Sequence, residues 1–345
     1  MINFEDINEI RKLDPQKVYE STGMLPAQCE QIWKDAYNIK IPKRDIDKLV
    51  IAGMGGSSYG GHVLESLFAD RLKIPLVIIN DYHLPKFADS KTLVVLTSYS
   101  GTTEETLSCA TEALRLGCQT LILTSGGELG NMVNTKQSPG LVFDPKHNPC
   151  GQPRLGTGYI IVGTIALIKQ TGLIDMTDDE FERAVYLLRS EQERIIKTAK
   201  ELSLKFDNKI PLIIAADFLK GNAHILRNQM NETAKSFANF SRLPELNHHL
   251  MEGLKYPKDN KLEALFLKSD LYETKIKQRL RLTEEVIAKN NVGITEYDAQ
   301  GNTKLDQVLN VLSFGGYLSL FLALIYDENP SLIPWVDYFK QELKK

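Results

Sequence analysis

The stretch Thr92-Leu-Val-Val-Leu-Thr97 followed by Ser98-Tyr-Ser-Gly-Thr-Thr103 decides the fold class of this sequence. Its first six residues form a continuous apolar and β-branched run, which is typical of a strand buried on both faces. The next six are rich in hydroxyl groups, and residues 104–116 then show the apolar spacing of an amphipathic helix. A buried strand, a polar turn and a helix in this order predict one unit of a parallel sheet.

Apolar runs of the same kind lie on both sides of this stretch. They predict further strands at residues 48–52, 75–80, 119–124 and 141–143, and then at 210–215, 262–267 and 292–297. Helical patterns lie between and after them, at residues 62–70, 156–169, 221–237, 273–290, 305–326 and 333–344. We therefore expect an α/β protein with two doubly wound subdomains, each with a central, mainly parallel sheet flanked by helices.

The chain has 345 residues, enough for about two domains of ordinary size. The charged amphipathic pattern of residues 181–205 predicts a linker helix between them. We expect an N-terminal helical segment and the first domain in residues 1–170, linker helices in 171–205, and the second domain with C-terminal helices in 206–345.

Composition and charge exclude several classes of function. A net charge of −3 argues against a general nucleic-acid binder. The apolar-rich run at residues 312–326 is shorter than the roughly 20 residues of a membrane helix, and residues 1–14 lack the apolar core of a signal peptide. Four scattered cysteines suggest reduced thiols. We expect a cytoplasmic protein without nucleic-acid or membrane partners.

The turn after the first predicted strand reads Gly53-Met-Gly-Gly-Ser-Ser58. Ligands of open α/β sheets bind beyond the carboxyl ends of the strands, where this turn lies. A dinucleotide fingerprint would need a third glycine at Ser58, although Asp81 after the next strand keeps that alternative open. A tight turn without a ligand is a second alternative. The adjacent hydroxyls of Ser57 and Ser58 favour an anion site.

The turn at residues 98–103 is more specific. Thr102 and Glu105 alone would fit a helix capping box. A cap uses one hydroxyl, however, and here four hydroxyl side chains stand within six residues at a helix start. Such uncharged donors suit a phosphate dianion at a helix N-terminus.

This loop closely resembles the phosphate loop of the sugar-isomerase (SIS) domain. Nearly the whole chain resembles one branch of that superfamily, the short bifunctional phosphoglucose/phosphomannose isomerases. The matching segments are residues 14–28, the glycine turn 53–57, Asp81-Tyr-His-Leu-Pro85, Pro153-Arg154 with Gly158-Tyr159, Asn231-Glu-Thr-Ala-Lys235 and Pro244-Glu-Leu-Asn-His248. Their joint order and spacing carry the resemblance, which implies two SIS-type subdomains.

The resemblance also implies the roles of the site residues. Glu232 is the base that moves a proton between C1 and C2, and His248 opens the sugar ring. Arg154 stabilises the enediolate, and Lys340 lies near the ring, with Lys344 as an alternative. The phosphate is held by Gly56, Ser57, Ser98, Ser100 and Thr103. His249-Leu250 replaces the frequent Asn-Glu after the histidine, so a role for His249 is in doubt.

Each of these side chains also has a plain structural interpretation. Glu232 lies off the apolar stripe of its predicted helix and could be a solvated glutamate. Arg154 could be a surface cation, His248 a packing residue, and Lys340 a favourable cation at a helix C-terminus.

The expected activity is the interconversion of glucose 6-phosphate and mannose 6-phosphate with fructose 6-phosphate through a cis-enediol. No cofactor and no metal are expected, because the base mechanism needs none and His62, His83, His147 and His224 are isolated. The family places its site at a homodimer interface, with the histidine from the partner subunit. A sugar-phosphate sensor would need a DNA-binding domain, for which residues 1–45 are too few and too acidic, and a hexosamine synthase would need an N-terminal nucleophilic cysteine.

Overall fold

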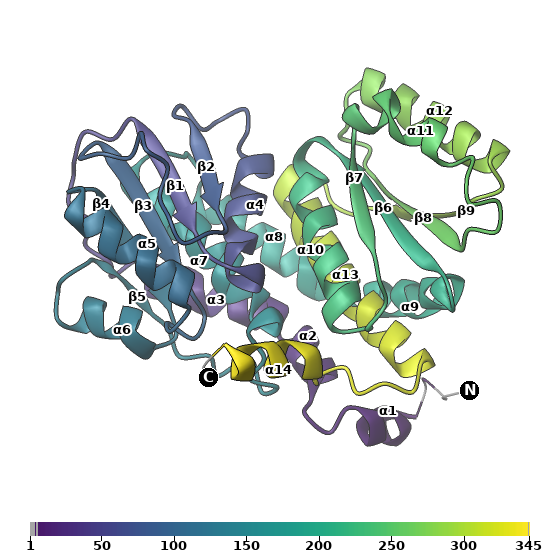
Figure 1. Ribbon diagram of the computed structural model, residues 1–345, viewed down its shortest axis with the longest axis horizontal. Coiled ribbons are helices and arrows are strands. Elements are labelled where there is room, and N and C mark those ends of the chain that lie inside the picture. The colour runs from purple at the N-terminus through teal and green to yellow at the C-terminus, as the bar shows by residue number, and fades with distance from the viewer. Residues whose placement is uncertain (1–3, 5, 344) are drawn as a thin grey trace.

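The computed structural model describes residues 4, 6–343 and 345, which form two α/β lobes (Figure 1). The first lobe contains a sheet of five parallel strands in the order β2-β1-β3-β4-β5. Its strands are β1 Lys48–Ala52, β2 Leu76–Ile79, β3 Thr92–Thr97, β4 Gln119–Thr124 and β5 Gly140–Val142. All five were predicted from the apolar runs, with shifts of at most one residue at the ends.

The second lobe contains four parallel strands in the order β7-β6-β8-β9. They are β6 Ile210–Ala216, β7 Asn239–Leu243, β8 Leu262–Lys268 and β9 Gly293–Asp298. The sequence pattern missed β7, because this edge strand reads Asn-Phe-Ser-Arg-Leu and is only partly buried. The expected α/β class with two parallel sheets is confirmed, while the domain boundaries remain a prediction.

Helices cover both sheets and begin the chain. The helices of the first lobe and the N-terminus are α1 Ile7–Leu13, α2 Val18–Gly23, α3 Leu25–Ala36, α4 Tyr59–Leu67, α5 Glu104–Arg115, α6 Gly127–Asn134 and α7 Thr157–Thr171. Those that follow are α8 Asp178–Ser190, α9 Gln192–Ser203, α10 Lys220–Glu232, α11 Leu250–Gly253, α12 Thr274–Lys289, α13 Lys304–Ile325 and α14 Pro334–Glu342. Short 3₁₀ turns are η1 Gly55–Ser58, η2 Pro153–Leu155, η3 Leu204–Phe206, η4 Asp217–Leu219 and η5 Glu245–His248.

Two predicted helices were wrong in extent. The single linker helix expected at 181–205 is two helices, α8 and α9, which meet at Glu191. The helix expected to reach Phe237 ends at Glu232, and Lys235 beyond it has a positive φ of 53°. A left-handed residue cannot continue a right-handed helix, so the chain must turn there.

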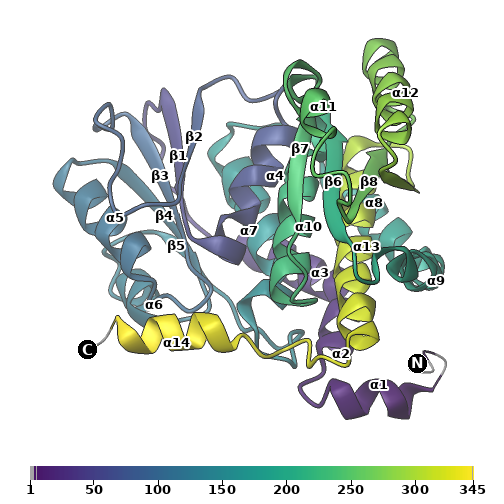
Figure 2. The same ribbon diagram turned by 45° about the vertical axis from the view of Figure 1, so that its right-hand side comes forward.

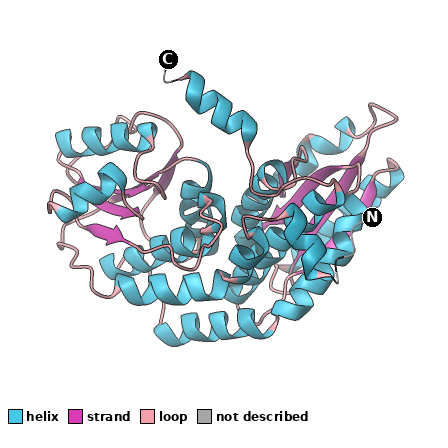
Figure 3. Ribbon diagram, turned by 90° about the horizontal axis from the view of Figure 1, so that it is seen from below, coloured by secondary structure: helices cyan, strands magenta, loops and turns pink. Residues whose placement is uncertain are grey.

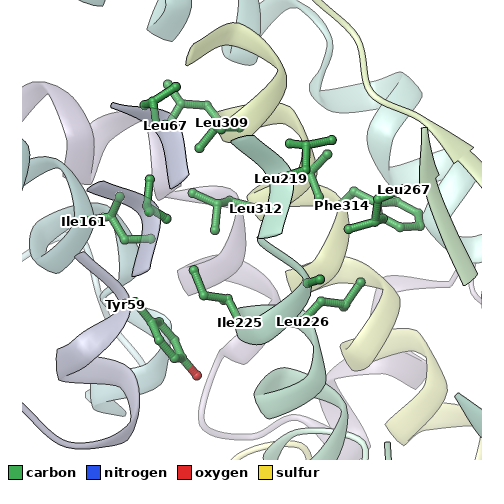
Figure 4. Close-up of a cluster of buried hydrophobic side chains, with 14 of the residues drawn as sticks. Tyr59, Leu67, Ile161, Leu219, Ile225, Leu226, Leu267, Leu309, Leu312 and Phe314 are labelled. Atoms are coloured by element: carbon green, nitrogen blue, oxygen red, sulfur yellow. The ribbon is translucent and has the colours of Figure 1, made fainter. Parts of the chain in front are cut away.

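An apolar core joins the two lobes. Figure 4 shows Ile225 of α10 and Leu312 of α13 on the side that faces Ile161 of α7 and Tyr59 of α4, while Leu226 of α10 lies on the side of Phe314. Helix α13 is long and apolar enough to cross a membrane, but 94% of its most apolar window is buried inside the protein. It therefore packs as the core helix that its sequence predicted.

Helix α14 lies apart from this core. None of its residues is buried. In Figure 2 it runs along the lower side of the molecule beneath the first lobe, and in Figure 3, which is seen from below, it projects beyond both lobes. Trp335, Tyr338 and Phe339 are 81%, 58% and 61% exposed. A helix with so much exposed aromatic surface is unusual for a monomer.

Candidate active site

The topology of the first sheet creates one crevice. Strands β1 and β3 are neighbours, yet the chain leaves β1 through α4 toward β2 and leaves β3 through α5 toward β4 on the opposite side. Such a switch point separates two adjacent loops and is the usual ligand site of a doubly wound sheet. The two turns that were selected from the sequence, η1 and residues 98–103, are these loops.

Hydrogen bonds fix the two loops to each other. The Oγ of Ser57 accepts from the backbone N–H of Tyr99 at 3.0 Å. The Oγ of Ser98 accepts from the N–H of Gly101 at 3.0 Å and lies 2.7 Å from Thr103 Oγ1. Ser57 and Ser98 are buried, whereas Ser100 is exposed at the mouth of the loop. The five predicted phosphate-binding residues, with Gly56 in η1, therefore lie on one preformed pair of loops.

Gly101 is required by the shape of the loop. Its φ is +70°, a region that side chains rarely adopt, and a Cβ there would lie 1.8 Å from the carbonyl oxygen of Gly126. The tight turn brings the start of α5 to the crevice, where its free N–H groups favour an anion.

Arg154 connects the phosphate loops to the second lobe. It is 4% exposed in η2, and its Cα lies 3.4 Å from the position a Cβ would take on Gly56. Its Nη2 donates to the carbonyls of Pro330 and Ser331, each at 2.8 Å, and its Nε donates to Thr233 Oγ1 at 3.4 Å. The guanidinium group is therefore held in a fixed position beside the end of α10.

Glu232 is the last residue of α10 and lies next to this cation. Burial raises the pKa of its carboxyl group above the ordinary value, and the charges of Arg154, Lys340 and Lys235 partly oppose that rise. A carboxylate with a raised pKa is a stronger base than an exposed one and can exchange a proton nearer to neutral pH.

The neighbourhood of Glu232 is positively charged. Arg154, Lys235 and Lys340 all lie within electrostatic reach of its carboxylate. Lys340 comes from the exposed helix α14, and Lys344 lies outside the described residues. Three cations around one carboxylate suit an anionic substrate and an intermediate that gains negative charge.

His248 was also predicted as a site residue, but the structure does not place it among the charged side chains around Glu232. It ends η5 in the second lobe and is exposed, and its imidazole forms no hydrogen bond with the described residues. Its neighbour His249 is bound to Glu245 at 2.8 Å between Nε2 and Oε2.

Two further side chains lie in the cluster and were not selected from the sequence. Tyr59 is fully buried at the start of α4, within electrostatic reach of Glu232 and Arg154. Lys235 donates from Nζ to the carbonyls of Thr233 and Asn329. Lys235 ends the motif at residues 231–235, and Tyr59 directly follows the glycine turn at residues 53–58. Only the fold shows that both lie within electrostatic reach of the Glu232 carboxylate. Among the described residues, no group of three or more His, Cys, Asp or Glu side chains could hold a metal ion.

Known proteins resemble this chain along most of its length. The bacterial phosphoglucose isomerase C-terminal SIS domain matches residues 195–343. The bifunctional phosphoglucose/phosphomannose isomerase of Caldicellulosiruptor bescii is 34% identical over 344 residues, covering 94% of this chain and 98% of that protein. The Aquifex aeolicus protein of the same name is 30% identical, covering 96% and 99%.

A solved structure shows the same fold at low sequence identity. The glucosamine-6-phosphate deaminase of Thermotoga maritima superimposes with a TM-score of 0.68 at 16% identity, covering 91% of this chain and 97% of its own. The extended identity to the curated relatives is decisive for the family, because it covers both lobes and all the motifs described above. The chain belongs to the bifunctional phosphoglucose/phosphomannose isomerase family.

Proposed function

We propose that this protein interconverts glucose 6-phosphate and mannose 6-phosphate with fructose 6-phosphate. The observation that carries the proposal is the half-buried carboxylate of Glu232 within electrostatic reach of the buried guanidinium group of Arg154. A base with a raised pKa next to a fixed cation is what proton abstraction from a carbon next to a carbonyl requires.

The phosphate loops position the other end of the substrate. The N–H groups at the start of α5 and the hydroxyls of Ser57, Ser98, Ser100 and Thr103 hold the phosphate, with Gly56 allowing close approach to the backbone. With C6 anchored there, C1 and C2 extend toward Arg154 and the end of α10, since η1 and η2 are in contact. Anchoring a remote group in this way lowers the entropy cost of the reaction.

The chemistry is a proton transfer between two carbons. Glu232 takes the proton from C2 of the open-chain aldose, and the electron pair moves to give a cis-enediolate whose charge faces Arg154. A proton then passes from O2 to O1, and the same carboxyl group returns a proton to C1, which gives the ketose. Glucose 6-phosphate and mannose 6-phosphate differ only at C2 and share one enediol. Rotation about the C2–C3 bond before reprotonation therefore lets one site act on both aldoses.

Ring opening requires a second acid–base group, and His248 takes this role from the partner subunit of a homodimer. Within one chain His248 is exposed and lies apart from Glu232. The exposed aromatic side chains of α14, which also carries Lys340, offer an apolar surface that a second subunit would cover. We place the enzyme in the cytoplasm, acting on a small phosphosugar without cofactor or metal.

A coupled assay on all three hexose phosphates tests the proposal. Wild type should convert glucose 6-phosphate and mannose 6-phosphate, and Glu232→Gln should lose about 10³-fold in kcat because the amide cannot accept the proton. Glu201→Gln, at an exposed position of α9, is the matched control and should leave kcat unchanged. Activity in Glu232→Gln equal to that of wild type would remove Glu232 as the base. Loss of activity on adding EDTA would contradict the metal-free mechanism.

A further inference from the structure

Lys235 lies three residues beyond Glu232 in an unfavourable backbone conformation. Its φ of +53° is left-handed, a region that is unfavourable for a residue with a side chain. Glycine or asparagine would adopt it more easily. The side chain that occupies the position must therefore compensate through its contacts.

Those contacts reach the segment that orients Arg154. The Nζ of Lys235 donates to the carbonyl of Thr233 at 3.0 Å and to that of Asn329. The next two carbonyls, of Pro330 and Ser331, accept from Arg154. Three successive carbonyls of one turn thus bind two cations, and the turn itself is closed by Asn329 Oδ1, which accepts from the N–H of Ser331 at 2.9 Å.

The charges around Lys235 come from several elements. Glu232 of α10 and Glu328, which follows α13, attract its ammonium group, and Arg154 of η2 repels it. Lys340 of α14 acts on the same Glu232 carboxylate. Burial is the largest cause that lowers the pKa of Lys235, to about 8, followed by the charge of Arg154. Lys235 is therefore charged at neutral pH and loses its proton under mildly alkaline conditions.

We propose that Lys235 is a positioning residue for the reaction, which holds the 329–331 turn against Arg154 and keeps Glu232 ionised through its positive charge. It touches no reacting atom and acts through Arg154 and Glu232. This inference rests on the proposed isomerase function, because it assigns Lys235 to the same site.

Three variants separate charge from backbone shape. Lys235→Met removes the charge and should lower kcat/KM about tenfold. The acidic limb of its pH profile should move to higher pH, because Glu232 then protonates more readily. Lys235→Arg keeps a charge that does not titrate, so the alkaline limb near pH 8 should disappear. Lys235→Gly relieves the left-handed strain and should lose activity as Lys235→Met does.

Lys268→Met is the control. It removes a partly buried lysine bound to Glu284 and Glu296, and both limbs of its pH profile should be unchanged.

A titration without substrate gives a second readout. In protein labelled with ¹³C-glutamate, the Glu232 carboxyl signal, assigned by its absence in Glu232→Gln, should titrate at a higher pH in Lys235→Met than in wild type. The proposal would be overturned if Glu232 titrated at the same pH in wild type and in Lys235→Met. It would also be overturned if the limbs of the pH profile of kcat/KM stayed in place while activity fell. The titration needs no turnover, so it can be measured even if the wild-type protein is inactive. An inactive wild type would contradict the isomerase function, and the titration would still show whether Lys235 affects the ionisation of Glu232.

Discussion

The two sheets have the same switch-point topology, but the loops at the two switch points carry different side chains. In the first, η1 with Gly56 and Ser57 follows β1, and the hydroxyl loop follows β3. In the second, η4 begins with Asp217 directly after β6, and Ser269-Asp270 follows the neighbouring strand β8. Carboxylates at the second crevice would repel a phosphate, whereas the hydroxyls and N–H groups at the first suit one. Topology therefore provides two crevices, and side-chain chemistry favours the first of them for the anion that we propose as substrate.

The second lobe carries the proposed catalytic groups at other places on its surface. Glu232 and Lys235 lie at the C-terminal end of α10, against the first lobe, and His248 lies after the edge strand β7. In this account the first lobe holds the substrate and the second acts on it. The following variants test this separation of roles between the two lobes.

The largest effect is expected from His248→Gln. The variant cannot open the ring, so kcat on the cyclic hexose phosphates should fall by about 10²–10⁴. The proposal gives His248 to the partner's site, so co-expression of His248→Gln with Glu232→Gln should restore about a quarter of wild-type activity, since half of the dimers would be mixed and each would have one intact site. Activity that stays at the level of the two single variants would show that His248 acts within its own chain.

A smaller loss is expected from Ser100→Asp. The carboxylate can still accept the hydrogen bonds that Ser100 Oγ accepts from Thr102, so the loop keeps its shape. The added charge faces the phosphate, and kcat/KM should fall about 100-fold. Asp217→Asn makes the reverse change at the second crevice, where asparagine tolerates the φ of +46°. It should stay within twofold of wild type, and an equal loss there would contradict the division between the crevices.

A loss of about tenfold is expected from Ser57→Ala. The change removes the acceptor for the N–H of Tyr99, which joins the two phosphate loops, and should raise KM for both aldose phosphates while kcat changes less. Ser58→Ala is the matched control, because Ser58 Oγ donates only to Gly55 O within its own turn. Equal KM values for the two variants would show that the bond between the loops does not matter for binding.

The smallest effect concerns the contact between the lobes. His62 of α4 stacks on His224 of α10 with ring centroids 3.9 Å apart. Burial and the charge of Arg227 lower the pKa of His62 to about 4, and burial and the other imidazole lower that of His224 to about 3. The folded state thus prefers both rings neutral, so the unfolded state binds more protons between about pH 6.5 and 4.

The free energy of unfolding should therefore fall as the pH drops through this window, by roughly 1–2 kcal/mol after allowance for solvent screening. Urea unfolding at pH 7 and pH 4.5 measures it. His62→Gln should show a smaller decrease than wild type, whereas His83→Gln, at an exposed histidine, should show the same decrease as wild type. A decrease in His62→Gln as large as in wild type would contradict this role of the pair.

The sequence predicted eight of the nine strands, because continuous apolar runs such as Thr92–Thr97 have no other stable place than a buried sheet. It missed β7, whose alternating polar residues reflect an edge position that only the tertiary structure defines. The break between α8 and α9 was invisible as well, since the amphipathic period continues across Glu191 without proline or glycine.

The site was predictable where a local pattern carries the chemistry. The hydroxyl loop could be interpreted from its own residues, because the donors for one phosphate stand close together in the chain. Glu232, Arg154 and Lys340 needed the family resemblance, since their proximity arises from three distant segments. The burial of Glu232, the exposure of His248 and the contacts of Lys235 with Asn329 are properties of the packed chain that no local pattern contains.

Exchange of the C2 proton tests directly whether Glu232 moves a proton from C2 to C1 by way of an enediol intermediate. Glucose 6-phosphate deuterated at C2 is incubated with wild type or Glu232→Gln in ordinary water, and the label is followed by NMR at C1 of fructose 6-phosphate and in the solvent. Wild type should move deuterium to C1 and release part of it to water, and Glu232→Gln should do neither at a measurable rate. Retention of deuterium at the original carbon during wild-type turnover, or undiminished loss of label with Glu232→Gln, would contradict the account.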